Sequence, residues 1–280
     1  MKANHNLLKQ VYFIGGKAGR PSTQIRCVQI CEHLGIDYQT GPEIMWEALK
    51  GKRIVVLVKP LMNVADFVRI KQQAYVVWDL HDSCPPRWEI DHFLFSTKHT
   101  SVVLNDLRPF SVIPHHHLNQ SRTIEPIRNV QKITYIGRPR WCPDDYLTSV
   151  NYKVFDTYKQ PRPVLENVYR NTDILLNIRT EDAESKFHVS INPGVKLINA
   201  IGFGIPSVSF PEPAFIEIGG DVTAICDKST LKDTIQELSN DYSRRKMMQD
   251  RCRLMAEKFH IDTVCYDYIQ LFERILGSLN

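Results

Sequence analysis

The segment that begins at Asn192 contains residue types that are suited to binding an anion. Asn192 is a favourable helix N-cap and Pro193 fits the first helical position, so a helix is predicted to begin here. Gly194 follows at a position where a better helix former would stabilise the helix more. A bare backbone at a helix N-terminus lets N–H groups approach an anion, which the helix dipole also attracts. The spacing therefore predicts an anion site around Gly194.

One face of the same predicted helix is polar. Lys196 lies one turn after Asn192, and residues three or four positions apart share a helix face. An exposed lysine without a ligand is the commoner case, but the spacing also fits a polar face that is directed at a ligand. The residues on this face are Asn192, Lys196, Asn199 and Phe203.

His81 and two neighbouring aspartates form a second group that could do chemistry. His81 follows the apolar run 74–80, at the carboxyl end of a predicted buried strand. Asp79 alternates to the same strand face as His81, and either Asp79 or Asp82 could orient the imidazole or act as a base. The alternative is a core histidine that bonds to a backbone carbonyl.

Neither the histidines nor the cysteines indicate a metal site. The residues of the triplet 115–117 would point in alternating directions on an extended segment, so they cannot all bind one ion. The chain has seven scattered cysteines and no C-x-x-C pair. This pattern favours a reduced, cytoplasmic protein over a disulfide framework or a zinc site.

The composition is that of a globular protein with a substantial core. The chain has 280 residues, of which 43% are hydrophobic and 24% charged, enough for one large domain or two ordinary ones. No apolar segment approaches the roughly 18 residues that span a bilayer, and the N-terminus suits a strand better than a signal peptide. The net charge of +4 permits phosphate-bearing partners but does not demand nucleic acid.

Short apolar runs alternate with helical patterns along the whole chain, which is typical of parallel α/β architecture. Continuous apolar runs indicate strands that are covered on both faces. The predicted strands are 11–16, 53–60, 74–82, 92–97, 101–105, 111–114, 132–140, 151–156, 173–178, 206–210 and 223–227. The predicted helices, besides the one that begins at Asn192, are 22–35, 63–73, 164–172, 229–240, 242–259 and 262–279.

The pattern restarts after a polar, proline-containing segment at 115–131, which is the predicted linker. Each half begins with a strand, a glycine and a helix, so the chain is expected to form two Rossmann-like domains, 1–120 and 121–261, facing across a cleft. In open parallel sheets, ligands bind beyond the carboxyl ends of the strands. The residues expected at those ends are Gly15, Gly16, Lys59, Pro60, His81, Asp82, Gly137 and Arg138.

Several common site motifs are absent from the sequence. The run GGKAGR lacks the G-x-G-x-x-G spacing of dinucleotide-binding proteins, and no G-x-x-x-x-G-K-[ST] loop occurs. A G-x-S-x-G elbow is also missing. These absences argue against NAD or FAD enzymes, P-loop NTPases and α/β-hydrolases.

Four segments together carry the pattern of a known family. They are VVWDLHD at 76–82, FSVIPHHH at 110–117, ITYIGRP at 133–139 and KLINAIGFGIPSVSFPEPAFIEI at 196–218. In this order and at these spacings, they resemble the GT-B glycosyltransferases, specifically glycosyltransferase family 4, over nearly the full chain. The resemblance implies the GT-B fold, in which a last helix, about 262–280, packs back toward the first domain.

The resemblance implies that the anion is the diphosphate of a nucleotide-sugar. Breaking the sugar–phosphate bond leaves negative charge on the diphosphate, and fixed donors aimed there supply much of the catalysis. His81 matches a histidine that lies beside the transferred sugar, with Asp79 and Asp82 flanking it. The expected donor-binding residues are Gly15, Gly16, Arg138, Arg140, Asn192, Gly194, Lys196, Asn199 and Glu217.

Two departures from the family pattern affect the expected site. The family places two glutamates seven residues apart, and the matching positions are Asn192 and Asn199, which keep hydrogen-bonding capacity but lose charge. This substitution fits a variant subfamily, a different donor or lost activity. The lysine that usually follows the Gly-Arg pair is also missing, and Arg140 or Lys196 is the expected substitute.

A loop after the first strand supplies three further cations, Lys17, Arg20 and Arg26. They would close over the donor phosphates or the acceptor if the resemblance holds. The alternative is a charged turn in solvent.

The resemblance implies a glycosyltransferase, hexosyl or pentosyl, that acts with retention and without a metal or another cofactor. The donor is a nucleotide-sugar, and the acceptor is a glycan, a small molecule or a modified DNA base. Three alternatives stay open: a non-catalytic nucleotide-sugar-binding protein, a sugar-nucleotide epimerase of GT-B fold, and a DNA-base glycosyltransferase.

Overall fold

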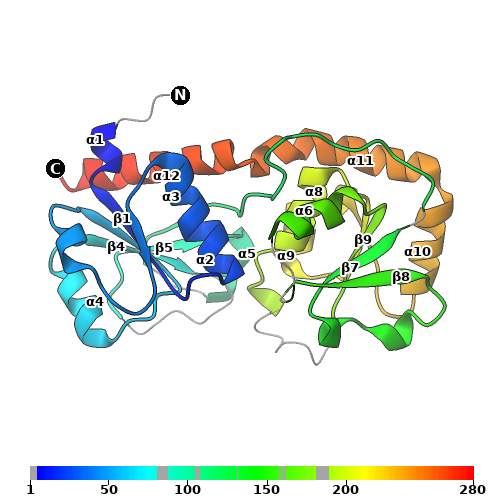
Figure 1. Ribbon diagram of the computed structural model, residues 1–280, viewed down its shortest axis with the longest axis horizontal. Coiled ribbons are helices and arrows are strands. Elements are labelled where there is room, and N and C mark those ends of the chain that lie inside the picture. The colour runs from blue at the N-terminus through cyan, green and yellow to red at the C-terminus, as the bar shows by residue number, and fades with distance from the viewer. Residues whose placement is uncertain are drawn as a thin grey trace. The chain divides into compact units, whose positions relative to one another are not determined.

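The computed structural model describes residues 5–80, 88–104, 108–130, 132–157, 159, 162–180 and 189–280. The chain divides into two compact units. The first unit consists of Met1–His115 together with Ile261–Asn280, and the second consists of His116–His260. Each unit contains one parallel sheet with helices packed against it (Figure 1). The α/β class predicted from the sequence is therefore confirmed.

The sheet of the first unit has six strands in the order β2-β1-β3-β4-β5-β6, and every neighbouring pair is parallel. Because the strands are parallel, their carboxyl ends lie along one edge of the sheet. The strands are β1 Val11–Gly15, β2 Tyr38–Thr40, β3 Ile54–Val58, β4 Tyr75–Leu80, β5 His92–Phe95 and β6 Phe110–Val112.

Helices cover both faces of this sheet. Along β1, Phe13 belongs to one core cluster together with α3 (Gln29–Leu34) and α12 (Ile261–Ser278), whereas Tyr12 belongs to another together with α4 (Val64–Lys71). Burial on both faces explains why these strands read as continuous apolar runs. The unit also contains α1 His5–Leu8, α2 Pro21–Thr23, a π-helical turn at Gln24–Val28, a 3₁₀ turn at Trp46–Leu49 and α5 Lys98–Leu104.

The last helix, α12, packs in the core of the first unit (Figure 1). Its apolar side chains belong to the same core cluster as those of β1. The ring centres of Tyr268 and Phe272 lie 6.0 and 6.2 Å from the ring centre of Phe13, so these aromatic rings are in contact. The buried residues of α12 include Val264, Tyr268, Leu271, Phe272 and Ile275.

One predicted strand is wrong. Residues 101–104, expected within a strand, lie in α5, which begins at Lys98. The hydroxyl of Thr97 accepts a hydrogen bond from the backbone N–H of Thr100, at 3.2 Å. A threonine side chain that satisfies an amide of the first turn favours a helix start, and this cap overrides the β-branched residues that follow.

The sheet of the second unit has five parallel strands in the order β11-β10-β9-β7-β8. The strands are β7 Ile133–Gly137, β8 Tyr152–Asp156, β9 Ile174–Asn177, β10 Ser207–Ser209 and β11 Thr223–Ile225. The helices are α6 Arg162–Arg170, α8 Val195–Phe203, α9 Pro213–Gly219, α10 Leu231–Asn240 and α11 Tyr242–Ala256. Short 3₁₀ turns lie at Pro139–Trp141, Asp144–Tyr146, Gly220–Val222 and Glu257–Phe259.

Two core clusters lie on opposite faces of this second sheet. Ile136 of β7 packs with α8, whereas Tyr135 of the same strand packs with α10. Within the described residues, none of the helices combines the length and hydropathy needed to cross a membrane.

Candidate functional site

Polar residues gather where the strands of the second unit end. Lys196 of α8 reaches the end of β7, because its Nζ lies 2.9 Å from the position that a Cβ on Gly137 would occupy. The same Nζ lies 4.3 Å from the centre of the Tyr135 ring, which is a cation–π distance. The phenol hydroxyl of Tyr135 in turn donates to the carbonyl of Arg138 at 3.4 Å. The structure therefore brings Lys196 next to the Gly137–Arg138 turn.

Glycine 137 creates the space that the lysine uses. A methyl group at this position would also lie 2.9 Å from the Tyr135 hydroxyl, closer than real Cβ contacts. Any larger residue would therefore push Lys196 or Tyr135 aside. The short sequence Tyr135–Gly137 thus fixes where the ammonium group of Lys196 sits.

The start of α8 differs from the prediction. The helix begins at Val195, and Gly194 is its N-cap with φ 70° and ψ 20°, in the left-handed region. The amide of Gly194 donates to Oδ1 of Asn192 at 3.0 Å. The expected start at Asn192 and Pro193 is therefore two residues too early, because a left-handed glycine makes the turn into the helix.

Gly194 also packs tightly. A Cβ there would lie 2.5 Å from Cδ1 of Ile218 and 3.2 Å from Cβ of Ala214, both on α9. The glycine is thus explained by its backbone conformation and by contact with α9, and its amide is bonded to Asn192. The helix amides that can face an anion are those that follow Gly194, in the first turn of α8.

Two arginines flank Trp141 after β7. The guanidinium carbon of Arg138 lies 4.4 Å from the Trp141 ring centre, and that of Arg140 lies 5.5 Å away. The indole is held by the 3₁₀ turn Pro139–Trp141, whose last carbonyl accepts from the amide of Thr180 at 3.0 Å. Three expected donor-binding cations, Arg138, Arg140 and Lys196, therefore lie on or beside one short turn.

Sequence reasoning missed a buried ion pair in this region. Nε of Arg179 lies 2.9 Å from Oε1 of Glu212, and the two side chains are only 10% and 5% exposed. Both charges act on Tyr135, whose pKa is raised mainly by burial. Arg179 and Glu212 follow β9 and β10 by two and three residues, so their positions after predicted strands were the available signal.

The position of Glu217 contrasts with that of Glu212. Glu217, the glutamate expected to bind the donor, is exposed on α9, whereas Glu212 is the N-cap of this helix and is buried. The acidic residue within the polar cluster is therefore Glu212.

Cys142 and Tyr152 close one side of the cluster. Burial raises the pKa of the Cys142 thiol to about 12, and the positive charge of Lys196 opposes this effect. Tyr152 donates to Oδ1 of Asp144 at 2.5 Å, and burial together with this bond raises its pKa. Both groups are thus neutral at physiological pH, and the region around Lys196 gains no thiolate or phenolate charge.

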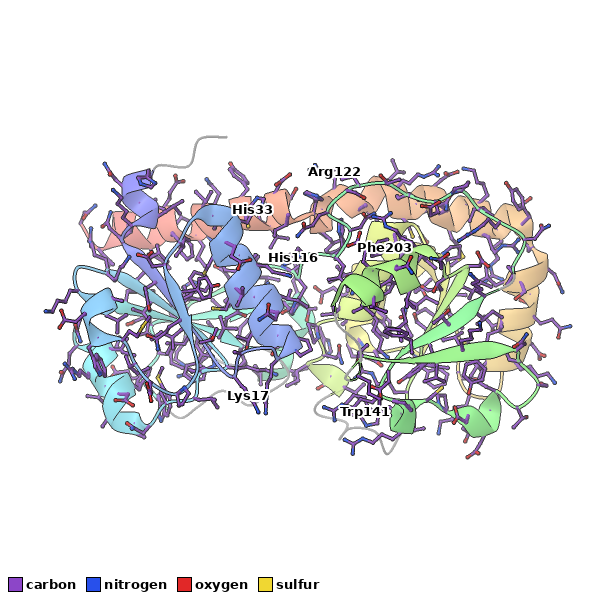
Figure 2. All side chains as sticks on the ribbon, viewed as in Figure 1. Lys17, His33, His116, Arg122, Trp141 and Phe203 are labelled. Carbon is purple, nitrogen blue, oxygen red and sulfur yellow. The ribbon has the colours of Figure 1, made fainter. Side chains whose placement is uncertain are left out.

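The expected polar face of α8 is split between two environments. Asn199 is buried, its Oδ1 accepts from the amide of Leu118 at 2.9 Å, and its Nδ2 donates to the hydroxyl of Tyr169 at 3.3 Å. Phe203, which is labelled in Figure 2, stacks on Tyr169 with ring centres 5.2 Å apart. We therefore correct the expected stripe: Lys196 points toward β7, whereas Asn199 and Phe203 enter the core because the segment after His117 covers them.

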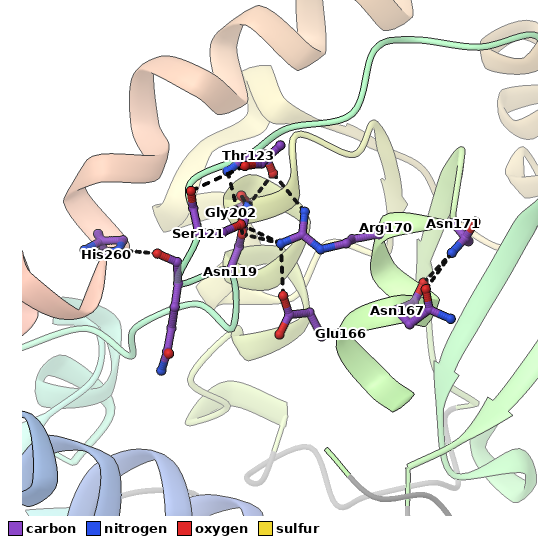
Figure 3. Close-up of polar contacts among 10 residues, drawn as sticks. Asn119, Ser121, Thr123, Glu166, Asn167, Arg170, Asn171, Gly202 and His260 are labelled. Carbon is purple, nitrogen blue, oxygen red and sulfur yellow. Dashed lines mark hydrogen bonds and ion pairs between the residues drawn. The ribbon is translucent and has the colours of Figure 1, made fainter. Parts of the chain in front are cut away.

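Arg170 of α6 holds this covering segment in place (Figure 3). Its guanidinium donates to Oδ1 of Asn119 at 2.9 Å, to Oγ of Ser121 at 2.7 Å and to the carbonyl of Thr123 at 3.2 Å. The amide of Asn119 also donates to the carbonyl of Gly202 in α8 at 2.7 Å. The first part of the predicted linker is therefore held in a fixed conformation by hydrogen bonds to α6 and α8.

The two expected glycines of the first unit serve the packing of its sheet edge. The amide of Gly16 donates to the carbonyl of Val58 at 2.9 Å, and a Cβ on Gly16 would lie 2.1 Å from the carbonyl oxygen of Lys59. A Cβ on Gly15 would meet Thr23 and Cys27 at 2.9 and 3.0 Å. Gly16 is thus needed because the residue after β3 lies against it, and Gly15 because the side chains of Thr23 and Cys27 do.

Asp79 is the one expected catalytic residue that the structure describes, since His81 and Asp82 lie outside the described residues. Its carboxylate accepts from Nε and Nη2 of Arg26, at 2.9 and 3.2 Å, and from the hydroxyl of Tyr268 at 3.0 Å. Arg26 was expected in a loop that closes over phosphates. It lies instead in the π-helical turn and is fully buried against Asp79.

The histidine triplet is buried at the boundary of the two units in the chain, with His115 in the first and His116 and His117 in the second. Nε2 of His117 lies 3.1 Å from the carbonyl of Ala256, and burial lowers the pKa of this imidazole to about 4. No group of three or more His, Cys, Asp or Glu residues in the described part of the chain could hold a metal ion. The six described cysteines are free and buried.

No protein-family model matches the sequence, and a search of curated proteins finds no significant relative. Solved structures do match. Anabaena Alr3699/HepE in complex with UDP and glucose has a TM-score of 0.64 at 10% identity, over 94% of this chain and 99% of that chain. AviGT4, a glycosyltransferase involved in avilamycin A biosynthesis, has a TM-score of 0.59 at 11% identity, over 96% and 98%.

A third similar structure is WaaG, a glycosyltransferase involved in lipopolysaccharide biosynthesis, with a TM-score of 0.57 at 10% identity, over 94% of this chain and 99% of that chain. The match extends over nearly the whole length of both chains in all three cases. The chain therefore shares the fold of the GT-B glycosyltransferases, and the fold that the sequence motifs implied is confirmed.

Proposed function

We propose that this protein is a glycosyltransferase that moves a sugar from a nucleotide-sugar donor to an acceptor. One observation carries the proposal: the ammonium of Lys196 lies at the Gly137–Arg138 turn, beside the start of α8, in a fold shared with proteins solved with UDP and UDP-glucose. Positive charge at a helix N-terminus is suited to a diphosphate.

In this proposal, the cations of the second unit stabilise the leaving group. The diphosphate gains negative charge as the sugar–phosphate bond breaks, and preorganised donors that face this charge lower the barrier. Arg138 and Lys196 supply the charge, while Trp141 keeps the Arg138 guanidinium oriented by cation–π contact. These fixed cations take the part that a metal ion plays elsewhere, so we propose transfer without a metal or another cofactor.

The finer parts of the proposal rest on the sequence resemblance. We propose retention of configuration at a hexosyl or pentosyl group, with His81 beside the transferred sugar and Asn192 near the donor. The acceptor is a glycan, a small molecule or a modified DNA base. The six cysteines that the structure describes are free and buried, which supports a reducing, cytoplasmic location.

The decisive experiment compares nucleoside diphosphates with bare nucleosides. A thermal-shift panel of nucleoside diphosphates and nucleotide-sugars identifies the donor, and titration calorimetry then gives Kd for wild type and for Arg138→Ala. Charge-assisted bonds contribute about 1.5–3 kcal/mol each, so the variant is expected to bind the diphosphate about 10- to 100-fold more weakly. Binding of the nucleoside should be almost unchanged.

A matched control is Arg128→Ala in the same unit. Arg128 forms an ion pair with Asp173 at 3.3 Å and is roughly half exposed, so its loss should leave both affinities unchanged. Equal losses for nucleoside and diphosphate in Arg138→Ala would mean that Arg138 supports the fold, and the proposed diphosphate site would have to be abandoned.

A specific observation favours a second candidate, a nucleotide-sugar-binding protein without transferase activity. Asn199 stands where the family has a glutamate, and its amide is used inside the protein by Leu118 and Tyr169. Slow hydrolysis of the bound donor without an acceptor would support transfer. Donor-induced stabilisation without any turnover, across a broad acceptor panel, would support the binding protein, and an epimerised donor would indicate the epimerase.

A further inference from the structure

Arg26, Asp79 and Tyr268 form a closed polar cluster inside the first unit. The Arg26 and Asp79 side chains are both 0% exposed, and the two groups share two hydrogen bonds in a side-by-side arrangement. The hydroxyl of Tyr268 donates to the same carboxylate, and its ring centre lies 5.3 Å from the Arg26 guanidinium carbon. Burial alone would lower the pKa of Arg26, but the charge of Asp79, the interaction with Tyr268 and the hydrogen bond to Asp79 together outweigh burial, so the net shift of the pKa is upward.

The backbone around Arg26 is unusual at the same place. Residues Gln24–Val28 form a π-helical turn between two α-helical segments. A π-turn adds a residue to the helix and changes the direction of the side chains on it, and such turns often lie at functional sites. Here it directs a long cationic side chain from a surface helix into the sheet.

This cluster ties the turn that carries Arg26 to three segments that are distant from it in the sequence. The other guanidinium nitrogen of Arg26, Nη1, donates to the carbonyls of Ile113 and Pro114, at 2.9 and 2.8 Å. Asp79 is the penultimate residue of β4, and Tyr268 belongs to α12. Residues 113–114 immediately precede the point where the chain leaves the first unit, and α12 begins where the chain returns to it.

Stability alone does not explain a buried ion pair. Well-packed apolar residues can replace such a pair without loss of stability, because the desolvation of both charges offsets much of their attraction. An ion pair differs from apolar packing in that its hydrogen bonds have fixed directions. In this cluster every bond sets the position of the end of β4 or of the 113–114 backbone.

We propose that Arg26 and Tyr268 are positioning residues of the transferase reaction, which act through Asp79 on the carboxyl end of β4. This role rests on the proposed function, in which His81, two residues after Asp79, lies beside the transferred sugar. Arg26 and Tyr268 then hold Asp79 in place. Because its carboxylate accepts their hydrogen bonds, Asp79 does not act as the base. The C-terminal helix thereby contributes to the reacting end of a strand from which it is 189 residues distant in the chain.

Tyr268→Phe tests the proposal because it removes one hydroxyl and leaves the Arg26–Asp79 pair. The matched control is Tyr12→Phe, which removes another buried hydroxyl of the first unit, one that donates to Gln39 and not to this cluster. Hydrogen exchange is followed at the amides of residues 76–80 and 111–113. Turnover is measured as hydrolysis of UDP-glucose, or of the donor that the thermal-shift panel selects, together with Kd for its nucleoside diphosphate.

The expected result is local and kinetic. Loss of a hydrogen bond to a charged group should raise exchange in the two segments about tenfold or more, because the donor that fixes the Asp79 carboxylate is removed. The turnover number should fall by a similar factor, while Kd for the nucleoside diphosphate stays within about twofold. Tyr12→Phe should change neither the exchange of these segments nor the turnover number.

Three outcomes would overturn the role. They are unchanged exchange in both segments, the same exchange pattern in Tyr12→Phe, or raised exchange with an unchanged turnover number. Failure of the proposed function looks different, because the wild-type protein itself would then neither bind a nucleoside diphosphate nor hydrolyse a donor.

Discussion

A glycine stands at the carboxyl end of the first strand of each unit, Gly16 directly after β1 and Gly137 as the last residue of β7, but the two glycines make room for different groups. The side-chain position of Gly16, after β1, is taken by the backbone carbonyl of Lys59, 2.1 Å from where a Cβ would be. The position of Gly137, at the end of β7, is taken by the ammonium of Lys196 and by the Tyr135 hydroxyl. In the first unit the glycine therefore serves main-chain packing, and in the second it accommodates a cation.

The charged residues near these two strand ends differ in the same way. In the first unit, Arg26 and Asp79 neutralise each other in the interior. In the described part of the second unit, Arg179 pairs with Glu212, while Lys196 and Arg138 contact aromatic rings. A strand–glycine motif thus marks the same place in both sheets without specifying whether a ligand site or a structural contact follows.

The largest predicted effect comes from removing one charge from each cluster. Asp79→Asn leaves Arg26 buried without its counter-charge, which should lower the free energy of unfolding by about 3–5 kcal/mol. Lys196→Met keeps the volume at a half-buried position and should change it by less than about 1 kcal/mol. Urea denaturation followed by tryptophan fluorescence measures both. Similar losses in the two variants would remove the distinction between a structural and a ligand-binding cluster.

The second prediction exchanges the two glycines for alanine. Gly16→Ala forces a methyl group against a main-chain carbonyl, so the free energy of unfolding should fall by about 1–3 kcal/mol or more. Gly137→Ala meets the ends of two side chains and should cost less. It should instead displace Lys196 and weaken binding of a nucleoside diphosphate by about three- to tenfold, for a loss of about 0.6–1.4 kcal/mol. A larger stability loss in Gly137→Ala would contradict the comparison.

The third prediction concerns the property in which the two units should differ least. Burial lowers the pKa of His92 in the first unit and of His117 in the second to about 4, with Arg274 and His260 adding to the effect and Asp91 and Glu257 opposing it. The unfolded chain then binds these protons first as the pH falls from about 6.5. The contribution of these two histidines to stability should therefore decrease between about pH 6.5 and pH 4 and stay constant below.

One histidine contributes at most about 1.4 kcal/mol per pH unit to this slope. His117→Gln keeps a donor for the carbonyl of Ala256 but removes the titration, so its unfolding free energy should depend less on pH than that of the wild type. An unchanged slope, measured by denaturation at pH 7, 6 and 5, would show that His117 is not the group that titrates.

Much of the fold could be predicted from local patterns. The buried strands read as apolar runs because both faces of each sheet are covered. The end of α3 was also predictable, because Gly35 takes the left-handed conformation that commonly ends a helix. The strand expected at 101–105 was wrong because Ser-Val-Val-Leu fits a strand and a helix equally, and only the cap from Thr97 decides.

The candidate site could be predicted only for residues whose place in space follows from their place at the end of a strand or the start of a helix. Lys196 and the Gly137–Arg138 turn lie together because the order of the strands in the sheet places both at the carboxyl end of β7. The role of Asn199 was missed because its partners, Leu118 and Tyr169, are 81 and 30 residues away and nothing local marks them. Arg26 was read as a loop cation for the same reason: its π-helical turn and its pairing with Asp79 depend on tertiary contacts.

The buried cysteines give each unit its own chemical reporter of unfolding. Cys27, Cys31 and Cys265 lie in the first unit, and Cys142, Cys226 and Cys252 lie in the second. Burial raises the pKa of Cys252 and Cys265 to about 12, so that roughly one such thiol in a hundred thousand is ionised at pH 7. The thiolate is the form that attacks alkylating reagents, so these sulfurs should react only after their unit opens. Mass spectrometry of pulse-alkylated protein can therefore time the opening of one unit against the other without any introduced label.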